Sequence, residues 1–592
     1  MCGIIGQIST SPIERETFCL KRDTLLHRGP DGKGAAFFQN DTIALGHTRL
    51  AFFDLSDNGT QPMSDRTRSV WITFNGEIYN FREIREDLIR LGIHFHTETD
   101  TEVIIEGYKY WGTDIINRLK GMFAFGLLDL NKQKLLLVRD RFGIKPLYYS
   151  NAFNEFIFAS ELKAIVKNSN HKYNIDFTAF ADYFTYRYIP SPKTIWQNIS
   201  KLPPAHFLDF DISTSKYTVT EYWKVNYHRK NISKEELAAE YGQKLEQSII
   251  LHARADVPIG SFLSGGYDSS AIVYFLTKNN YLPETFSIGF ENWNNSEDQY
   301  AAIVAKQFGL KHHALVVNEN DLNLADIMPK VYDEPIADIS ILPTYLVSKN
   351  AKLHVKAVMG GEGADELLGG YTWQKDWYRK NSSNWKYKLL GWDNHSSDTI
   401  VRYYAEAMAM GNFNTMEQKK LLHENYHHSI PDDCHWFYRQ NNKSDSLSSF
   451  QAIQHMDMKC FMGELVLTKI DRASMANSLE VRVPFLDHEL YELVLAYNEK
   501  CYINNTTTKP LLFENIKNAL PSEILNRKKQ GFVGPDQFYM NMKWYEENLK
   551  SSTLIKEGII NQEYYLHLLA QKDHWRLWKL LVMEKWFNYW AY

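Results

Sequence analysis

The stretch SGGYDSS, at Ser264–Ser270, follows the apolar run Val257–Leu263 and leads into the apolar segment Ala271–Leu276. A short apolar run, a glycine-rich turn and a longer apolar segment are typical of a strand, loop and helix in a parallel α/β sheet. The backbone N–H groups and serine hydroxyls of such a loop can bind a pyrophosphate at the positive end of the helix dipole. The sequence GxxxxGK[ST] does not occur in the chain, which excludes the usual P-loop NTPase. This stretch therefore predicts a nucleotide site in an α/β domain.

A second passage of the same kind, GGEGADELLGGY at Gly360–Tyr371, follows the apolar run Lys352–Met359. Open parallel sheets bind ligands beyond the carboxyl ends of their strands, so we expect both turns to face one site. The small residues of this passage let a ligand approach the backbone closely, and Glu362 and Asp365 supply carboxylates. Paired carboxylates near a pyrophosphate suit magnesium. We expect Asp268 and Asp365 to be the magnesium ligands.

Residues 1 to about 165 show a different pattern, with short β-branched and aromatic runs in pairs. Phe123–Leu130 and Lys134–Asp140 are two apolar runs joined by a polar turn, as in a hairpin. Asn80 and Glu83 have the spacing of a capping box at the start of a helix with one apolar face. These patterns predict antiparallel sheets covered by helices.

The length of the chain supports a division into domains. Its 592 residues are several times what one hydrophobic core usually organises. A stretch rich in proline and polar residues, Ile189–Tyr222, marks the expected boundary. We predict a first domain over residues 1–190, a linker region over 191–225 and a second domain over 226–592.

Composition excludes several classes of function. With 44% hydrophobic and 23% charged residues the chain is expected to fold, and its formal charge of -5 lacks the basic excess of nucleic-acid-binding proteins. No apolar run approaches the ~18 residues of a membrane helix, and the amino terminus lacks a signal-peptide pattern. We therefore expect a cytoplasmic protein with no nucleic-acid or membrane partner. Five widely separated cysteines argue against a disulfide framework or a zinc cluster.

One of these cysteines, Cys2, is at the second position. Methionine aminopeptidase removes Met1 when the next residue is small, so Cys2 can become an amino-terminal thiol that carries its own α-amine. That amine has a pKa near ~8 and can accept the thiol proton, directly or through water. Such a nucleophile needs no histidine partner. Position alone leaves open the alternative of a buried structural cysteine.

Six separated segments, in order, carry a resemblance to a known domain. They are CGIIG (Cys2–Gly6), HRGPD (His27–Asp31), HTRL (His47–Leu50), QPM (Gln61–Met63), FNGEIYN (Phe74–Asn80) and RDRFGIKPLYY (Arg139–Tyr149). Together they resemble the class II glutamine amidotransferase domain, an amino-terminal-nucleophile glutaminase. The resemblance implies an αββα sandwich in which Cys2 attacks the side-chain amide of glutamine.

The same resemblance implies that glutamine is held by Arg49, Asn75, Gly76, Glu77 and Asp100. Arg49 can grip the α-carboxylate in a bidentate manner, and Asp100 can hold the α-ammonium. The Asn75 amide and the Gly76 backbone N–H can donate to the oxyanion that forms on attack. The local pattern alone also fits Asp100 as a helix cap and Gly76 as a turn residue with positive φ.

SGGYDSS resembles the PP-loop of ATP pyrophosphatases, which cleave ATP between the α and β phosphates. With DRASMANSLEVRVPFLD at Asp471–Asp487 and RKKQGF at Arg527–Phe532, the chain resembles the B-type glutamine-dependent asparagine synthetase family from Cys2 to about Pro535. The resemblance implies ATP and Mg2+ as cofactors and a parallel-sheet second domain. The implied ATP-binding residues are Leu263, Ser264, Gly265, Gly266, Asp268, Ser269, Ser270, Ile288, Gly289, Gly360 and Gly361.

Two further residues receive catalytic roles from the resemblance. Glu362 would serve the acyl-adenylate and ammonia steps, and Lys529 would face the phosphates. Arg527 and Lys528 flank Lys529, so a solvated basic face is the alternative for this run. The R-x-K-x-G-F spacing favours the catalytic role of Lys529.

The predicted reaction is amidation of a small carboxylate. Glutamine supplies ammonia, ATP activates the acceptor as an acyl-adenylate, and ammonia converts it to an amide. Aspartate is the expected acceptor, but the segment DEPIADISILPTY, at Asp333–Tyr345, has no arginine to pair with its α-carboxylate. Arg472, Arg482 and Lys469 are candidate substitutes for the missing cation. Another carboxylate, such as a uronic acid or a biosynthetic intermediate, is the alternative acceptor.

A catalytically silent scaffold is an alternative from a different class. A degenerate enzyme usually loses one reactive residue, whereas this chain retains Cys2, Arg49, Asn75, Asp268, Glu362 and Asp365. We therefore expect an enzyme, acting alone or as a homodimer.

Overall fold

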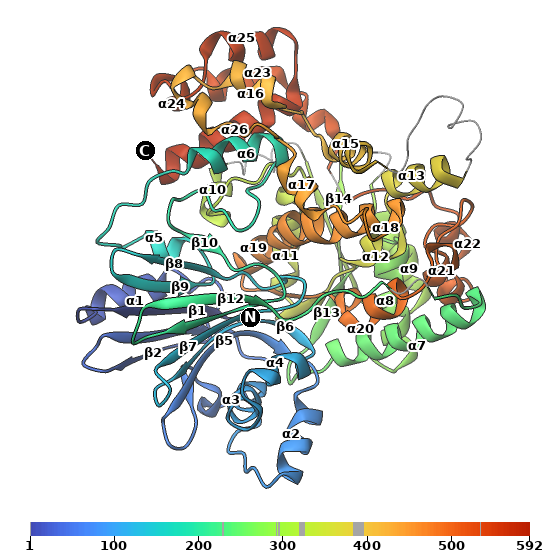
Figure 1. Ribbon diagram of the computed structural model, residues 1–592. Coiled ribbons are helices and arrows are strands. Elements are labelled where there is room, and N and C mark those ends of the chain that lie inside the picture. Colours follow the sequence, from blue (N-terminus) through green and yellow to red (C-terminus); the bar gives the residue numbers. More distant parts are fainter. Residues whose placement is uncertain are drawn as a thin grey trace.

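Three sheets organise the part of the chain that the structure describes (Figure 1). The structure, a computed structural model, describes residues 2–591 except 228–229, 292, 294–295, 319–325, 383–395 and 533. Two antiparallel six-stranded sheets are built from residues before about 225, and one parallel five-stranded sheet follows. The predicted two-domain α/β fold is confirmed.

The first antiparallel sheet has the strand order β10-β8-β9-β1-β3-β2, and the second has the order β12-β11-β7-β6-β5-β4. Their strands are β1 (Gly3–Ser9), β2 (Gly32–Phe38), β3 (Ile43–Arg49), β4 (Met63–Ser64), β5 (Val70–Ile78), β6 (Gly121–Asp129), β7 (Lys134–Arg139), β8 (Tyr148–Ala152), β9 (Glu155–Ala159), β10 (Ser200–Lys201), β11 (His206–Asp211) and β12 (Lys216–Glu221). The predicted hairpin is confirmed, because β6 pairs with β7.

The two sheets stack face to face with helices outside them. In β6, Ala124 and Leu128 belong to the core between the sheets, while Phe123, Phe125 and Leu127 face the helical side. This alternation follows from the two-residue period of a strand. The covering helices are α2 (Phe81–Arg90), α3 (Asp100–Trp111) and α4 (Ile115–Arg118) on one side and α1 (Arg15–Asp23) and α5 (Lys163–Val166) on the other. The arrangement is the expected αββα sandwich.

Two local expectations differ from the structure. Residues 191–225, predicted as a linker region, contribute β10, which pairs with β8, and β11, which pairs with β7. Leu208 and Phe210 lie in the core between the sheets, so this segment completes them rather than joining two domains loosely. Asn80 does not cap α2, because its side chain accepts from the Lys120 N–H and donates to the Arg118 carbonyl.

The parallel sheet has the strand order β15-β14-β13-β16-β17. Its strands are β13 (Ile259–Phe262), β14 (Thr285–Phe290), β15 (His312–Val317), β16 (Ala357–Met359) and β17 (Glu480–Arg482). From β13 the chain runs outward to β14 and β15 and then crosses to β16 on the other side. Such a reversal leaves a crevice at the carboxyl ends of the two central strands. The loops after β13 and β16 are the two glycine-rich turns.

Helices surround this sheet and extend beyond it. They are α7 (Lys234–His252), α8 (Tyr267–Lys278), α9 (Asp298–Gln307), α10 (Met328–Val331), α11 (Ile341–Lys352), α12 (Ala364–Leu368), α13 (Thr372–Ser382), α15 (Ser397–Met408), α16 (Thr415–Leu421), α17 (Trp436–Asn441), α18 (Ser449–Met456), α19 (Leu467–Met475), α20 (His488–Leu495), α21 (Pro510–Ile516) and α22 (Ser522–Leu525). Ser233 and Glu236 form a capping box at the start of α7.

The last helices form a separate layer at one end of the molecule (Figure 1). They are α23 (Met542–Leu549), α24 (Thr553–Lys556), α25 (Gln562–Ala570) and α26 (His574–Trp590), and they lie near α6 (Phe177–Tyr186). α26 packs against α10, and the Tyr183 hydroxyl of α6 donates to the Lys579 carbonyl at 2.9 Å. The carboxyl-terminal segment therefore packs against both α10 and α6.

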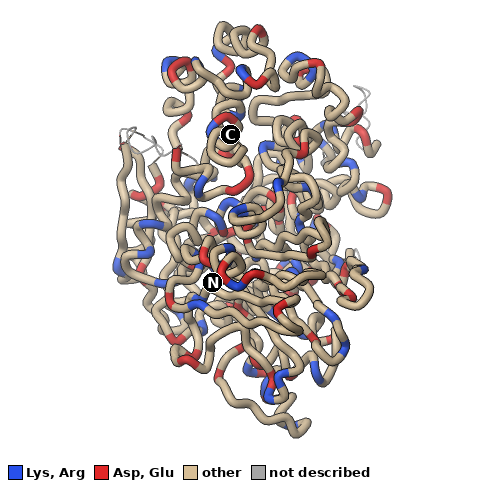
Figure 2. The backbone as a smooth tube through the Cα atoms, turned by 90° about the vertical axis from the view of Figure 1, so that its left-hand side faces the viewer, with Lys and Arg blue, Asp and Glu red and all other residues tan. Residues whose placement is uncertain are grey.

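Charges of both signs are interspersed over the molecule (Figure 2). This agrees with the near balance of 66 Lys and Arg against 71 Asp and Glu. Within the described ranges, no helix has both the length and the apolar character needed to cross a membrane.

Candidate active sites

Cys2 lies directly before β1, in the buried layer between the two domains. Gly3 pairs with Thr48, and this antiparallel register places Cys2 opposite Arg49. The Cys2 backbone nitrogen donates to Asn75 Oδ1 at 3.0 Å, and its Sγ lies 4.0 Å from the Leu50 carbonyl. Burial raises the pKa of the Cys2 thiol. Met1, whose removal the sequence predicts, lies outside the described residues.

Asn75 and Gly76 are consecutive residues of β5, and the Asn75 side chain contacts the Cys2 backbone nitrogen. Asn75 is fully buried, and its Nδ2 has no hydrogen-bond partner among the described residues. Gly76 has φ +153°, and a Cβ there would lie 2.1 Å from the Met122 carbonyl of the neighbouring strand. An unsatisfied buried donor costs about 1–3 kcal/mol unless a ligand accepts from it. The geometry suits the predicted oxyanion donors.

Arg49 ends β3 beside Cys2, but its guanidinium is turned toward the following loop. It donates to the Ser56 carbonyl at 2.8 Å and to the Phe53 carbonyl at 3.3 Å, and it lies against Gly59. The structure thus brings Arg49 to the site but directs its donors to its own loop. To bind a glutamine carboxylate in a bidentate manner, the Arg49 guanidinium must give up at least one of its hydrogen bonds to these carbonyls.

Glu77 and Asp100 form the opposite wall. Asp100 is the first residue of α3, and its Oδ2 accepts from the Ile78 N–H at 3.0 Å. The helix cap is Thr99, whose side chain accepts from Glu102 N, so Asp100 does not serve as the cap. Burial raises the pKa of Asp100 to about 6.

Glu77 also contacts the second domain. Its Oε2 lies 3.4 Å from Nη2 of Arg482, whose Nε donates to Glu480 at 2.6 Å. Both partners lie on β17 of the parallel sheet. Burial and the nearby Glu480 carboxylate raise the pKa of Glu77. The synthetase sheet therefore contributes charges to the wall of the glutaminase site.

Two histidines of the amino-terminal segments, His47 and His27, contact other groups of the protein. Burial lowers the pKa of His47 to about 3, and its Nε2 lies 3.1 Å from the Phe74 carbonyl, so the ring stays neutral. His27 Nε2 lies 3.2 Å from Glu161. Arg141 donates to two backbone carbonyls. These contacts give His27 and Arg141 structural roles.

The PP-loop has the expected position between β13 and α8. Gly265 has φ +71°, and a Cβ there would lie 2.5 Å from Cβ of Tyr300. The Ser264 N–H donates to Ser269 Oγ at 3.2 Å, and the Gly266 N–H donates to Ser264 Oγ at 3.3 Å. α8 begins without a side-chain cap, which leaves its amino terminus available to an anion.

The two expected metal ligands lie together and are bridged by a lysine that the sequence gave no reason to select. Lys509 Nζ is 2.5 Å from both carboxylate oxygens of Asp268 and 2.6 Å from Asp365 Oδ1. Lys529 also forms an ion pair with Asp365. Burial raises the pKa of Asp365, but the Lys509 and Lys529 charges outweigh it and hold that pKa well below its usual range. Both carboxylates thus converge on one cationic group, and carboxylate oxygens are the ligands that magnesium prefers.

Glu362 follows β16 and folds back over Gly360. A Cβ on Gly360 would lie 2.1 Å from Glu362 Oε2, and one on Gly361 would lie 2.9 Å from Asp268 Cβ. Glu362 Oε2 is buried without a hydrogen-bond partner in the part of the chain that the structure describes. Burial raises the pKa of Glu362, although the Lys469 charge opposes this.

The remaining predicted nucleotide residues line the neighbouring strands. Leu263 follows β13, while Ile288 and Gly289 lie on β14, next to it in the sheet. A Cβ on Gly289 would lie 2.6 Å from the Asp298 carboxyl group. Ser270 is buried in the first turn of α8, with no described hydrogen-bond partner for its Oγ. The structure thus gathers the predicted ATP-binding residues at one crevice.

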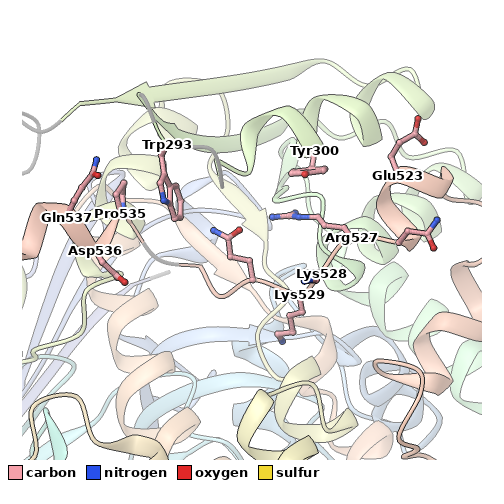
Figure 3. Close-up of a pocket in the computed structure, with 11 residues that line it drawn as sticks. Trp293, Tyr300, Glu523, Arg527, Lys528, Lys529, Pro535, Asp536 and Gln537 are labelled. Carbon is pink, nitrogen blue, oxygen red and sulfur yellow. The ribbon is translucent and has the colours of Figure 1, made fainter.

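A cavity of about 970 Å³ opens beside this crevice (Figure 3). Arg527 and Lys529 both line it. Arg527 lies under the Tyr300 ring, 4.1 Å from its centroid, donates to the Ser264 carbonyl at 2.9 Å and pairs with Glu297 at 2.8 Å. Arg527 is therefore fixed to the PP-loop, whereas Lys529 pairs with Asp365. The alternative of a solvated basic run does not fit these two contacts.

The segment Asp333–Tyr345, which we call the acceptor segment, runs from α10 into α11. Its first two carboxylates are already paired. Asp333 accepts from the Lys163 N–H at 3.0 Å and pairs with Arg472 at 3.1 Å. Glu334 pairs with Lys201 at 3.0 Å. Neither carboxylate is free to meet an acceptor ammonium.

Asp338 is the remaining acidic residue of the acceptor segment. Burial raises its pKa, but the charges of Lys469 and Arg187 outweigh this and lower it. Lys469 Nζ lies 2.7 Å from Ser340 Oγ, and Arg187 Nη1 lies 3.9 Å from Asp338. Of the candidate cations, Lys469 thus lies at the acceptor segment and acts electrostatically on Glu362.

The other candidate cations are already neutralised. Arg472 forms buried ion pairs with Glu161 at 2.8 Å and with Asp333. Arg482 pairs with Glu480 and reaches the glutaminase wall. Arg187, in contrast, was not selected from the sequence. It has φ +70° at the end of α6, a position without a motif.

Two family models together match most of the chain. The glutamine amidotransferase domain model matches residues 1–223, and the asparagine synthase model matches residues 240–588. Asparagine synthetase [glutamine-hydrolyzing] 1 of Bacillus subtilis is 32% identical, with 99% of this chain and 96% of that protein covered. Asparagine synthetase [glutamine-hydrolyzing] 3 of the same organism is 30% identical over 90% of this chain and 87% of that protein. Amidase chry2 of Gibberella zeae is 26% identical over 91% and 90%.

Proposed function

The chain belongs to the glutamine-hydrolysing asparagine synthetase family, and we propose that it converts aspartate to asparagine with ammonia from glutamine. Glutamine-dependent, ATP-driven amidation follows from the family itself. Beyond the family assignment, we propose the identity of the acceptor and the residues that act in each step. The proposed location is the cytoplasm, where ATP and glutamine are supplied.

Glutamine hydrolysis begins at Cys2. After removal of Met1, the α-amine takes the thiol proton, and Sγ attacks the side-chain amide carbon of glutamine. The oxyanion accepts from the free Nδ2 of Asn75 and from the Gly76 N–H. Loss of ammonia leaves a thioester, which water hydrolyses to glutamate. Arg49 and Asp100 hold the two charged ends of the substrate.

At the synthetase site, the PP-loop and the amino terminus of α8 bind the phosphates. Asp268 and Asp365 would hold Mg2+, because their oxygens already converge on one cationic group. The bound ion would neutralise phosphate charge. Lys529 places its charge toward the leaving pyrophosphate, and Glu362, whose pKa is raised by burial, is placed to exchange protons with the acceptor.

One arrangement supports aspartate as the acceptor. Lys469 supplies a cation at Ser340, and Asp338 lies beside it. An α-amino acid needs one partner of each sign, and an unpaired buried charge would cost several kcal/mol. Lys469 can take the α-carboxylate and Asp338 the α-ammonium, which leaves the side-chain carboxylate for activation.

The test is incubation with ATP, magnesium, glutamine and a panel of carboxylates, followed by mass spectrometry of the products. We expect asparagine, glutamate, AMP and pyrophosphate in equal amounts. Amide formation from another carboxylate, with none from aspartate, would refute the acceptor assignment and leave the amidation chemistry intact.

A second acceptor is favoured by one observation. The acceptor segment has no arginine, and the acids Asp333 and Glu334 at its start are already paired within the protein. An acceptor such as a uronic acid or a biosynthetic intermediate need not carry an α-ammonium that pairs with these acids. The same carboxylate panel separates the two proposals.

A further inference from the structure

The carboxyl-terminal helix α26 holds the acceptor segment through two indole groups. Trp586 Nε1 donates to the Asp333 carbonyl at 3.1 Å, and Trp578 Nε1 donates to the Ala337 carbonyl at 3.2 Å. Both side chains are buried. They are separated by about two turns of helix, so they lie on one face of α26.

A third donor comes from the segment before α23. The Tyr539 hydroxyl donates to the Ile339 carbonyl at 2.8 Å. Tyr539 is buried, and its own carbonyl accepts from the Tyr545 hydroxyl at 2.9 Å. Trp578, Trp586 and Tyr539 together are called the aromatic clamp below.

The clamp donates hydrogen bonds to backbone carbonyls that lie outside regular secondary structure. Residues 333–340 belong to no helix or strand, so the carbonyls of Asp333, Ala337 and Ile339 have no partner within a helix or a strand ladder. A buried carbonyl without a partner costs about 1–3 kcal/mol, so such a segment keeps its conformation only if outside donors satisfy it. The clamp supplies donors to three carbonyls within seven residues.

The clamped carbonyls flank the residues proposed to contact the acceptor. Asp338 lies between Ala337 and Ile339, and Ser340, which holds Lys469, follows directly. The clamp approaches from the side of α26, while Lys469 belongs to α19. The aromatic groups therefore act on the acceptor contacts through the backbone.

We propose that the aromatic clamp consists of positioning residues that set the affinity for the acceptor carboxylate. This inference rests on the proposed function, because it takes the acceptor segment as the place of binding. It also gives the Trp- and Tyr-rich carboxyl-terminal segment a role in specificity.

The test uses variants that remove the donor and keep an aromatic side chain; only Tyr539→Phe leaves the ring itself unchanged. Trp578→Phe and Trp586→Phe delete one N–H each, and Tyr539→Phe deletes one hydroxyl. Trp590→Phe is the matched control, because Trp590 lies on the same helix but donates to Pro329, outside the segment. Steady-state kinetics are measured with full-length enzyme for acceptor, ATP and glutamine separately.

Each clamp variant should raise KM for the acceptor about three- to tenfold, the effect of one hydrogen bond. kcat at saturating acceptor and KM for ATP and glutamine should stay as in the wild type. Hydrogen exchange of residues 333–340 should quicken in the clamp variants and not in Trp590→Phe.

Unchanged acceptor KM in a Trp578→Phe, Trp586→Phe double variant would overturn the proposal, as would an equal rise in Trp590→Phe. If tryptophan variants unfold, Tyr539→Phe gives the decisive KM. If the wild-type enzyme amidates a carboxylate other than aspartate, the same comparison is made with that carboxylate, so failure of the acceptor assignment is distinct from failure of the clamp.

Discussion

Replacing Lys509 with methionine should destabilise the enzyme in a way that magnesium reverses. Lys509 is buried, and its ammonium is within 2.6 Å of both Asp268 and Asp365. Methionine keeps the length of the side chain but leaves the two carboxylates facing each other. Removing one partner of a buried ion pair costs about 3–5 kcal/mol, and we expect about 3 kcal/mol because Lys529 still pairs with Asp365.

The assay is urea unfolding at neutral pH, with a chelator or with millimolar magnesium. A divalent cation can replace the lost ammonium, so magnesium should stabilise Lys509→Met much more than the wild type. The pKa of Asp365 is lowered in the folded state, so its contribution to stability is present above the unfolded pKa and disappears as pH falls through the folded pKa. The difference between variant and wild type should therefore shrink in acid.

Lys528→Met is the matched control, because Lys528 is an exposed neighbour in the same basic run as Lys529. It should leave the free energy of unfolding within about 0.5 kcal/mol of the wild type. A loss below about 1 kcal/mol in Lys509→Met, or equal stabilisation of variant and wild type by magnesium, would refute the idea that Lys509 holds the metal ligands together.

Three other outcomes follow from the sites. Cys2→Ala should abolish glutamine-dependent amidation while ammonia-dependent amidation continues; residual glutamine use would rule out Cys2 as the nucleophile. Asp268→Asn and Asp365→Asn should each slow formation of AMP and pyrophosphate at least tenfold and retain glutaminase activity, and ADP as the stoichiometric product would contradict the PP-loop assignment. With its pKa raised to about 6, Asp100 loses its negative charge as pH falls, so KM for glutamine should rise below about pH 6. A flat KM profile in the wild type, or a sloping one in Asp100→Asn, would exclude Asp100 as the ammonium partner.

Local patterns were enough to predict the PP-loop and the hairpins. The strand, glycine turn and helix at Ser264–Ser270 need only neighbouring residues, and their position at the crevice follows from the order of the parallel strands. Asp100 could be a cap or a ligand by its pattern, and only the packed structure shows that Thr99 caps the helix.

Residues whose partners are distant in the sequence could not be identified from local patterns. Lys509 follows three threonines, with no motif around it, and its partner Asp268 is 241 positions away in the chain. Asp333 begins the acceptor segment, but its partners Lys163 and Arg472 come from two separate elements. Which charges are neutralised is decided by tertiary packing, and a single sequence does not contain that information.

The buried charges between the domains bear on how the two sites cooperate. Arg28 donates to the Cys2 carbonyl at 3.1 Å and pairs with Glu161 at 2.7 Å and with Asp471 at 2.8 Å. Arg472, next to Asp471, shares Glu161 and pairs with Asp333 at the start of the acceptor segment.

These side chains are almost fully buried, and each needs a partner from the other domain. Separating the domains would leave several charges unpaired, at several kcal/mol each, unless water replaced the lost partners. The network therefore favours a fixed arrangement in which the carbonyl of the nucleophile and the acceptor segment are joined by an unbroken chain of ion pairs. A rigid junction of this kind suits the proposed reaction, in which ammonia released at Cys2 would have to reach the second site before it escapes, because a fixed junction keeps the distance between the sites constant.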